Sequence, residues 1–254
     1  MNKKLVTFMA LPAILLASSC KSEYTVTDVS RTRILIDNHY DDNSDKEAVA
    51  FLSPYKCKVD SMMSPVVGTV SKYMAAHRPE SELSNLVSDI LMWGGKEFNE
   101  KPDFAVYNMG GIRAALPQGN ITYGDIVNIA PFENKICFVT LSGENALKLF
   151  RQIAASGGEG VSHGIEMVIS KDRKLIDVKL NGEEIVPDKS YRVVTIDYIA
   201  QGNDGMDAFK SGTDVLSPQD KKNDSRFIII DYFKEQASKG VIVDPHVEGR
   251  IVEK

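Results

Sequence analysis

The segment Asn108-Met109-Gly110-Gly111-Ile112-Arg113 carries the clearest structural signal in this chain, a strand that ends in a tight turn. The apolar run before it, Phe104–Tyr107, is typical of a short buried strand. Two consecutive glycines remove side chains where the backbone turns and where a ligand can approach closely. Asn108 offers an amide, and Arg113 offers a planar cation suited to phosphate oxygens. The same pattern also occurs in turns that bind nothing, so alone it is weak evidence for a site.

A second segment has the same design. Asp197-Tyr198-Ile199-Ala200-Gln201-Gly202-Asn203-Asp204-Gly205 follows a predicted strand at 191–196. Two glycines flank an Asn-Asp pair, and Tyr198 adds an aromatic ring. Aspartate between glycines is also an ordinary turn residue, so this loop is equally weak evidence by itself.

The rest of the chain mixes helical and strand-like patterns. Helices are predicted at 47–63, 83–91, 123–130, 143–153 and 226–237. Strands are predicted at 65–73, 136–141, 165–169, 175–180 and 250–252. Asn181-Gly182 predicts a hairpin turn. The sequence therefore predicts the α+β class, as one mixed α/β domain.

The first residues resemble an export signal. Residues 1–19 contain a charged start, an apolar run and a small-residue region. The apolar run is shorter than the roughly 20 residues that a membrane-spanning helix needs. Cys20 directly after it resembles the lipobox of bacterial lipoproteins, which implies acylation of its thiol and a membrane anchor in the bacterial cell envelope. The alternative is an ordinary secreted protein with an incidental cysteine.

Three parts are predicted along the chain. Residues 1–19 are a lipoprotein signal peptide, 20–46 a polar tether with a short strand at 33–37, and 47–254 one compact domain, because an apolar helical stripe begins near residue 47. Cys57 and Cys137 could form one disulfide or stay as buried free thiols.

The charge limits the ligands that this chain can take. The formal net charge of -5 argues against a general surface for polyanions, so we expect no nucleic-acid partner. Any phosphate binding must come from a few well-placed groups.

The segments between and around the two loops make the pattern more specific. Ile121-Thr122-Tyr123-Gly124-Asp125-Ile126 and Ala130-Pro131-Phe132 lie between the loops. In this order the motifs resemble those of the C-terminal domain of the 5'-nucleotidase and UDP-sugar hydrolase family, usually Asn-Gly-Gly-Gly-Ile-Arg, Ile-Thr-Tyr-Gly-Asp, Pro-Phe and Asn-Gly-Gly-Asp-Gly. The resemblance covers about residues 51–252, including segments 80–86 and 248–250.

The resemblance implies a nucleotide-binding domain. In this family two aromatic rings hold the base between them; Phe132 matches the first, and Tyr198 stands where phenylalanine is usual. Asp204 matches the acidic residue that accepts hydrogen bonds from ribose hydroxyls. The expected substrate-binding residues are Asn108, Gly110, Gly111, Arg113, Phe132, Tyr198, Asp204 and Arg78.

Three positions depart from the family pattern. Met109 and Asn203 each replace a glycine, and asparagine tolerates a left-handed backbone better than most residues. Arg78 lies near the place of a phosphate-binding arginine but is displaced from it, and a solvated surface charge is its alternative interpretation. For the two rings, the alternative is core packing.

The family's metal ligands have no counterpart here. Family hydrolysis uses two metal ions in an N-terminal metallophosphatase domain, which carries paired histidine motifs. This chain has four histidines, and no two are close in sequence: His39, His77, His163 and His246. Asp37-Asn38-His39 matches one motif in isolation, which we interpret as coincidence. We therefore expect no catalytic residues and no metal or other cofactor in this chain, with divalent metals only in a partner.

These observations predict a lipid-anchored, stand-alone nucleotide-binding domain that works with a separate metallophosphatase subunit in nucleotide catabolism. Together they would hydrolyse a nucleoside monophosphate or a nucleotide sugar. A nucleotide- or nucleoside-binding lipoprotein, an interaction scaffold and a self-sufficient phosphatase remain alternatives. The sequence leaves open the base, the sugar, the membrane leaflet and the oligomeric state.

Overall fold

The computed structural model describes residues 24–43 and 45–254. The expected signal peptide and Cys20 lie outside the described residues. Contacts divide the chain into two units, Met1–Phe51 and Leu52–Lys254, which are considered separately. Within the part that the structure describes, no helix is long and apolar enough to cross a membrane.

The segment before the second unit contains little regular structure. Residues 24–36 form no helix or strand, and a 3-10 helix, Asn38–Asn43, follows. The short strand predicted at 33–37 is therefore wrong. A strand needs a neighbour for its backbone hydrogen bonds, and no described strand pairs with this segment. The side chains of Ile34 and Ile36 are exposed accordingly.

Helix α2 (Lys46–Met63) confirms the helix predicted at 47–63, but its apolar residues are not buried. None of its residues is buried. Val49, Leu52 and Val59, which belong to the predicted apolar stripe, are each more than half exposed. Much of the stripe that suggested a domain start near residue 47 is thus exposed, and full burial begins only with the following strand, β1 (Val66–Val70).

A five-stranded sheet forms the centre of the second unit. Its strands run in the order β10 (Thr213–Leu216), β4 (Ile136–Ser142), β9 (Ser190–Ile196), β2 (Phe104–Tyr107) and β5 (Gly160–Val161). Strands β2 and β9 are parallel, whereas the other neighbouring pairs are antiparallel. The predicted strands at 104–107, 136–141 and 191–196 are confirmed.

Two smaller sheets complete the strands. One has the order β11 (Ile251–Glu253), β6 (Ile165–Ile169), β7 (Leu175–Leu180) and β8 (Glu183–Glu184). The other pairs β1 with β3 (Gly119–Thr122). Asn181 and Gly182 both have positive φ, 53° and 79°, between β7 and β8, which confirms the predicted hairpin turn.

Three of the five α-helices that follow α2 in the described chain begin after a serine or threonine whose side chain caps the helix. The five are α3 (Glu82–Gly94), α4 (Tyr123–Ile129), α5 (Gly143–Ser156), α6 (Asp197–Ala200) and α7 (Ser225–Ser238), and the three capped in this way are α3, α4 and α5. The Thr122 hydroxyl accepts the Asp125 N–H, and the Asp125 carboxylate accepts the Thr122 N–H, a reciprocal cap that confirms the predicted start of α4. The Ser142 hydroxyl caps α5 by accepting the Asn145 N–H at 3.3 Å.

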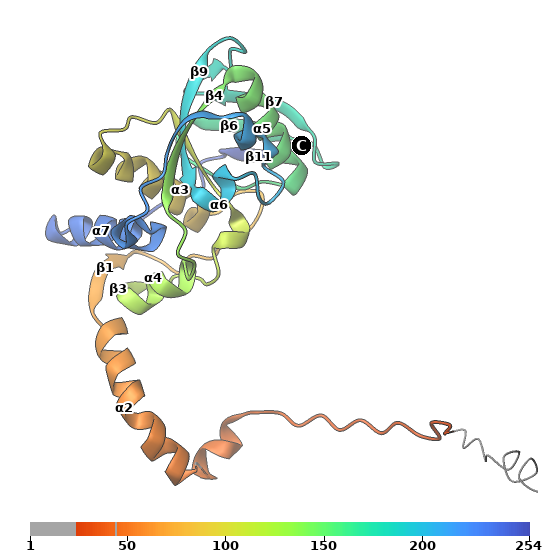
Figure 1. The fold of residues 1–254 in the computed structure, drawn as a ribbon, viewed down its shortest axis with the longest axis vertical. Helices are drawn as coiled ribbons and strands as arrows, with labels where there is room; N and C mark the ends of the chain where they lie inside the picture. Colours follow the sequence, from red (N-terminus) through yellow and green to blue (C-terminus); the bar gives the residue numbers. More distant parts are fainter. Residues whose placement is uncertain (1–23, 44) are drawn as a thin grey trace, which may run out of the picture. The chain divides into compact units, whose positions relative to one another are not determined.

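The core lies between the five-stranded sheet and its helices. Helix α3 contacts β2, β5 and β9, α5 contacts β4 and β9, and α7 lies beside α3 and β1 (Figure 1). The largest fully buried side chains include Tyr107, Phe104, Phe138, Phe150 and Phe233. This packing confirms a mixed α/β domain and holds the ends of β2 and β9 in place.

The two described cysteines are both free thiols. Cys137 is buried in β4, as expected of a free thiol, whereas Cys57 is exposed on α2. The disulfide considered from the sequence is therefore absent between these two residues. The predicted burial of the free thiols holds for Cys137 but not for Cys57.

Candidate functional site

Parallel pairing of two strands brings the two predicted loops together. In the register of β2 and β9, Phe104 faces Val193 and Ala105 faces Val194. Parallel neighbours end at the same edge of a sheet. The loops that follow Tyr107 and Ile196 therefore emerge side by side, although they are far apart in sequence.

The first loop is shaped by a close contact at Gly111. Residues Met109–Gly111 form one 3-10 turn, in which the Gly111 N–H donates to the Asn108 carbonyl at 2.9 Å. A Cβ atom on Gly111 would lie 2.5 Å from the Asn108 Oδ1, which is closer than atoms pack. Glycine is needed at this position for space, since its φ is not positive. Arg113 Nη1 donates to the Gly110 carbonyl at 3.2 Å, leaving most of its donors uncommitted.

The second loop places its strained residue where the sequence did not suggest it. Asp204 has a φ of +53°, between Gly202 at +83° and Gly205 at +77°. Asn203, which replaces a glycine of the family pattern, donates its side-chain amide to the Tyr198 carbonyl at 2.7 Å. Aspartate tolerates the left-handed region because its short polar side chain can bond locally.

Asp204 joins the two loops. Its Oδ2 accepts a hydrogen bond from Asn108 Nδ2 at 2.6 Å, and its Oδ1 accepts one from the Tyr198 hydroxyl at 2.9 Å. The hydrogen bond to this carboxylate raises the pKa of the Tyr198 phenol above its ordinary value. Asn108 is almost fully buried, whereas Tyr198 is 39% exposed. The contacts thus fix the carboxylate while leaving the tyrosine ring open to a ligand.

These residues line one cavity of about 360 Å³. Its lining is Asn108, Gly110, Gly111, Arg113, Phe132, Asn134, Tyr198 and Asp204. The Phe132 ring is 46% exposed and so is not core packing, and the Arg113 guanidinium lies 6.0 Å from its centre. An exposed ring beside a cation, a carboxylate and a second ring forms a surface suited to a flat polar ligand.

Asn134 is the lining residue that the sequence interpretation missed. It follows Phe132 by two residues in the turn after α4. Its position two residues after Phe132 could have indicated it, because residues of one turn lie close together.

Arg78 does not line this cavity, although the sequence placed it with the others. Its Nε donates to the Gly158 carbonyl at 2.8 Å, and its Nη2 pairs with the Glu159 carboxylate. His163 does not line this cavity either, and its Nδ1 lies 2.8 Å from Glu248 Oε2. Across residues 24–43 and 45–254, no cluster of three or more histidine, cysteine or acidic side chains is arranged to hold a metal ion.

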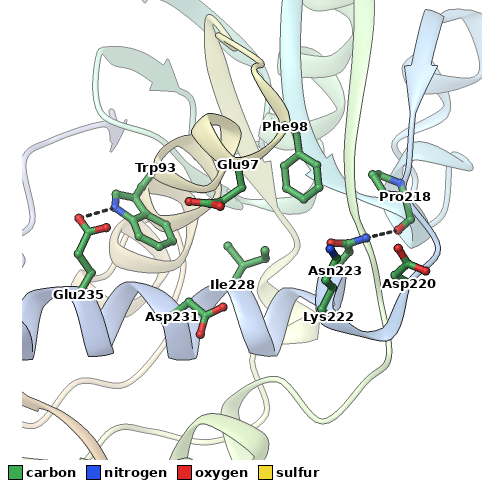
Figure 2. A pocket seen from close by; sticks show the side chains of 10 residues that line it. All are labelled: Trp93, Glu97, Phe98, Pro218, Asp220, Lys222, Asn223, Ile228, Asp231 and Glu235. Atoms are coloured by element: carbon green, nitrogen blue, oxygen red, sulfur yellow. Dashed lines mark hydrogen bonds between the residues drawn. The ribbon is translucent and has the colours of Figure 1, made fainter.

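A larger cavity of about 520 Å³ lies between the C-terminal part of α3 and α7 (Figure 2). Trp93 and Phe98 form part of its wall, and the Trp93 indole donates to Glu235 at 3.3 Å. Its charged lining consists of four carboxylates and one ammonium: Glu97, Asp220, Asp231, Glu235 and Lys222. This excess of negative charge opposes phosphate binding, so the smaller cavity is the better candidate for a nucleotide.

A family comparison places the smaller cavity in context. The model of the 5'-nucleotidase C-terminal domain matches residues 66–211, more than half of the chain, and this range contains both loops and the Phe132 turn. The chain belongs to the 5'-nucleotidase C-terminal domain family. This confirms the resemblance that the motifs indicate.

The relatives with which this chain aligns are considerably longer than it. The chain is 28% identical to the trifunctional nucleotide phosphoesterase protein YfkN of Bacillus subtilis, aligning 89% of this chain with 16% of that protein. It is 25% identical to protein UshA of Escherichia coli, over 80% of this chain and 36% of UshA. The crystal structure of a 5'-nucleotidase precursor from Thermus thermophilus matches with a TM-score of 0.69 and 26% identity, over 81% of this chain and 42% of the other. The chain therefore spans less than half of each of these relatives, and its fold is that of a 5'-nucleotidase C-terminal domain.

Proposed function

We propose that this chain binds a nucleotide or nucleoside with its base between Phe132 and Tyr198 and confers substrate specificity on a 5'-nucleotidase or UDP-sugar hydrolase system. The observation that carries the proposal is one cavity lined from both loops. Aromatic faces stack on any base, and a carboxylate such as Asp204 accepts hydrogen bonds from ribose hydroxyls. The guanidinium of Arg113 suits a phosphate oxygen.

The hydrolytic step is assigned to a separate metallophosphatase polypeptide. Such a domain activates water and stabilises charge on phosphorus with two metal ions. The sequence of this chain lacks the paired histidine motifs of that domain. Relatives named as a nucleotide phosphoesterase and a 5'-nucleotidase support the reaction class. Acylation of Cys20 would hold the pair at the bacterial cell envelope.

Calorimetric titration with a panel of nucleotides and nucleosides tests the binding function directly. We expect saturable binding of at least one ligand, followed by phosphate release when a metallophosphatase and divalent metal are added. Binding without release, with every candidate partner, would favour a nucleotide-binding lipoprotein that has no catalytic partner. Release of phosphate by the isolated chain would instead show a self-sufficient phosphatase. Absence of binding across the panel would contradict the proposal and favour a scaffold.

Replacing Phe132 with alanine separates ligand stacking from packing. Because the ring is nearly half exposed, we expect little change in the free energy of unfolding. Loss of one stacked base should weaken ligand binding by about 1–3 kcal/mol. Tyr73→Ala is the matched control, since Tyr73 is 66% exposed and does not line the cavity. A large loss of stability with unchanged affinity would assign Phe132 to the core.

A further inference from the structure

A buried carboxylate, Glu159, lies directly beneath the first loop. Strand β5 pairs antiparallel with β2, with Gly160 opposite Tyr107. Continuing this register places residue 159 beside residue 108, where the loop begins. Gly158 permits the approach, because its φ is +108° and a Cβ atom there would lie 2.4 Å from the Pro79 carbonyl. The strand pairing thus places Glu159 beneath the first loop, although Glu159 does not line the cavity.

The two carboxylate oxygens of Glu159 have different partners. Oε2 accepts the backbone N–H of Met109, the first residue of the 3-10 turn. Oε1 accepts a hydrogen bond from Arg78 Nη2, whose guanidinium also donates to the Gly158 carbonyl. Hydrogen bonds to an ionised acceptor are stronger than those between neutral groups. One side chain therefore ties the loop backbone to a cation on a distant segment.

Burial makes this pairing obligatory. Glu159 is 3% exposed, and a buried carboxylate is costly unless a counter-charge and hydrogen bonds compensate it. Arg78 is the cation paired with this carboxylate among the described residues. Two of the five guanidinium N–H donors of Arg78 are thus engaged below the loop, and Arg78 does not line the cavity, whereas Arg113 does.

A displacement of the loop at Glu159 would be transmitted to the residues that line the cavity through the hydrogen bonds described above. The turn that Glu159 holds begins after Asn108, and Asn108 positions Asp204 through the 2.6 Å hydrogen bond. Asp204 in turn accepts the Tyr198 hydroxyl. A shift of the Met109 backbone would therefore move the carboxylate that faces the ribose.

We propose that Glu159 is a positioning residue that anchors the first loop through Met109, and that Arg78 serves as its counter-charge and not as a phosphate ligand. The effect on ligand affinity rests on the proposed nucleotide-binding function. The anchoring itself does not, because it exists in the ligand-free protein. A backbone measurement can thus test it independently.

Hydrogen exchange of the backbone amides at 109–113 tests the anchor without any ligand. We expect Glu159→Ala to raise exchange in this segment, and Glu159→Gln to restore most of the protection because its side-chain oxygen still accepts the Met109 N–H. Glu100→Gln is the control, since Glu100 forms a partly buried ion pair with Arg192 away from the cavity. Unchanged exchange at 109–113 in Glu159→Ala, or a rise throughout the protein equal to that of the control, would overturn the proposal.

Calorimetry with adenosine and adenosine 5'-monophosphate tests the role of Arg78. We expect Glu159→Ala and Arg78→Ala to lower the affinity for both ligands by the same factor, about tenfold, because the loop position affects the binding of the nucleoside part that the two ligands share. A loss confined to the monophosphate in Arg78→Ala would make Arg78 a phosphate ligand and overturn the proposal. If the unmodified protein binds neither ligand nor any other in the panel, the proposed function fails, while the exchange measurement still decides whether Glu159 anchors the loop.

Discussion

At the scale of single residues, Tyr198 differs from the phenylalanine usual at its position by one hydroxyl with a defined partner. That hydroxyl donates to Asp204 Oδ1, while Asn108 occupies Oδ2. The carboxylate is thereby oriented before any ligand arrives, and its remaining lone pairs stay available for further donors. Orientation in advance reduces the entropy that binding must overcome.

Titration of the Tyr198 phenol should reveal this bond. The hydrogen bond to the Asp204 carboxylate raises the folded-state pKa of this phenol. The bond therefore stabilises the folded protein at pH values below the ordinary tyrosine pKa, and this stabilisation is lost as the pH rises through the raised pKa. We expect Asp204→Asn to lower the pKa of this phenol, as measured by NMR of ring-labelled tyrosine. Tyr198→Phe identifies the resonance. An unchanged Tyr198 pKa in Asp204→Asn would contradict the proposed contact.

At the scale of elements, helix α4 connects strand β3 to the turn that carries Phe132. Its reciprocal cap satisfies backbone donors at the helix start, and the Thr122 hydroxyl also lies 2.7 Å from Asp125 Oδ2. Without a cap, these donors would need water or another partner. The cap therefore stabilises an element only seven residues long.

Removal of the cap should cost stability. We expect Thr122→Ala to lower the free energy of unfolding by about 1 kcal/mol, the usual cost of losing an N-cap side chain. Denaturant midpoints at constant slope measure this change. Thr213→Ala, at an exposed strand residue, should change stability less. Equal effects of the two substitutions would argue that the cap contributes nothing specific.

At the scale of the whole molecule, the two described thiols should differ in reactivity. Burial raises the pKa of Cys137 to about 11, so at pH 8 its thiol is protonated as well as shielded, whereas Cys57 is exposed. We expect iodoacetamide to modify Cys57 in the folded protein and Cys137 only after denaturation, as read by peptide mass mapping. A cross-linked peptide containing both cysteines would contradict the structure.

The prediction of the fold from sequence succeeded where structure is local. The Thr122 cap, the Asn181-Gly182 turn and the strand before each loop depend on residues close together in the chain, whose backbone preferences and hydrogen bonds act over a few positions. The strand at 33–37 failed because a strand also needs a distant partner. The stripe on α2 predicted the helix correctly but not its exposure, since none of the residues of this helix is buried.

The candidate site shows the same division between sequence and tertiary structure. The family resemblance that the motif order carries selected seven of the eight residues that line the cavity. The meeting of Asn108 with Asp204, 96 residues apart, depends on the parallel pairing of β2 with β9. Burial of Glu159 beneath the loop depends on the register of β5. Neither arrangement could follow from local sequence, because long-range strand pairing sets which side chains lose water and which charges they meet.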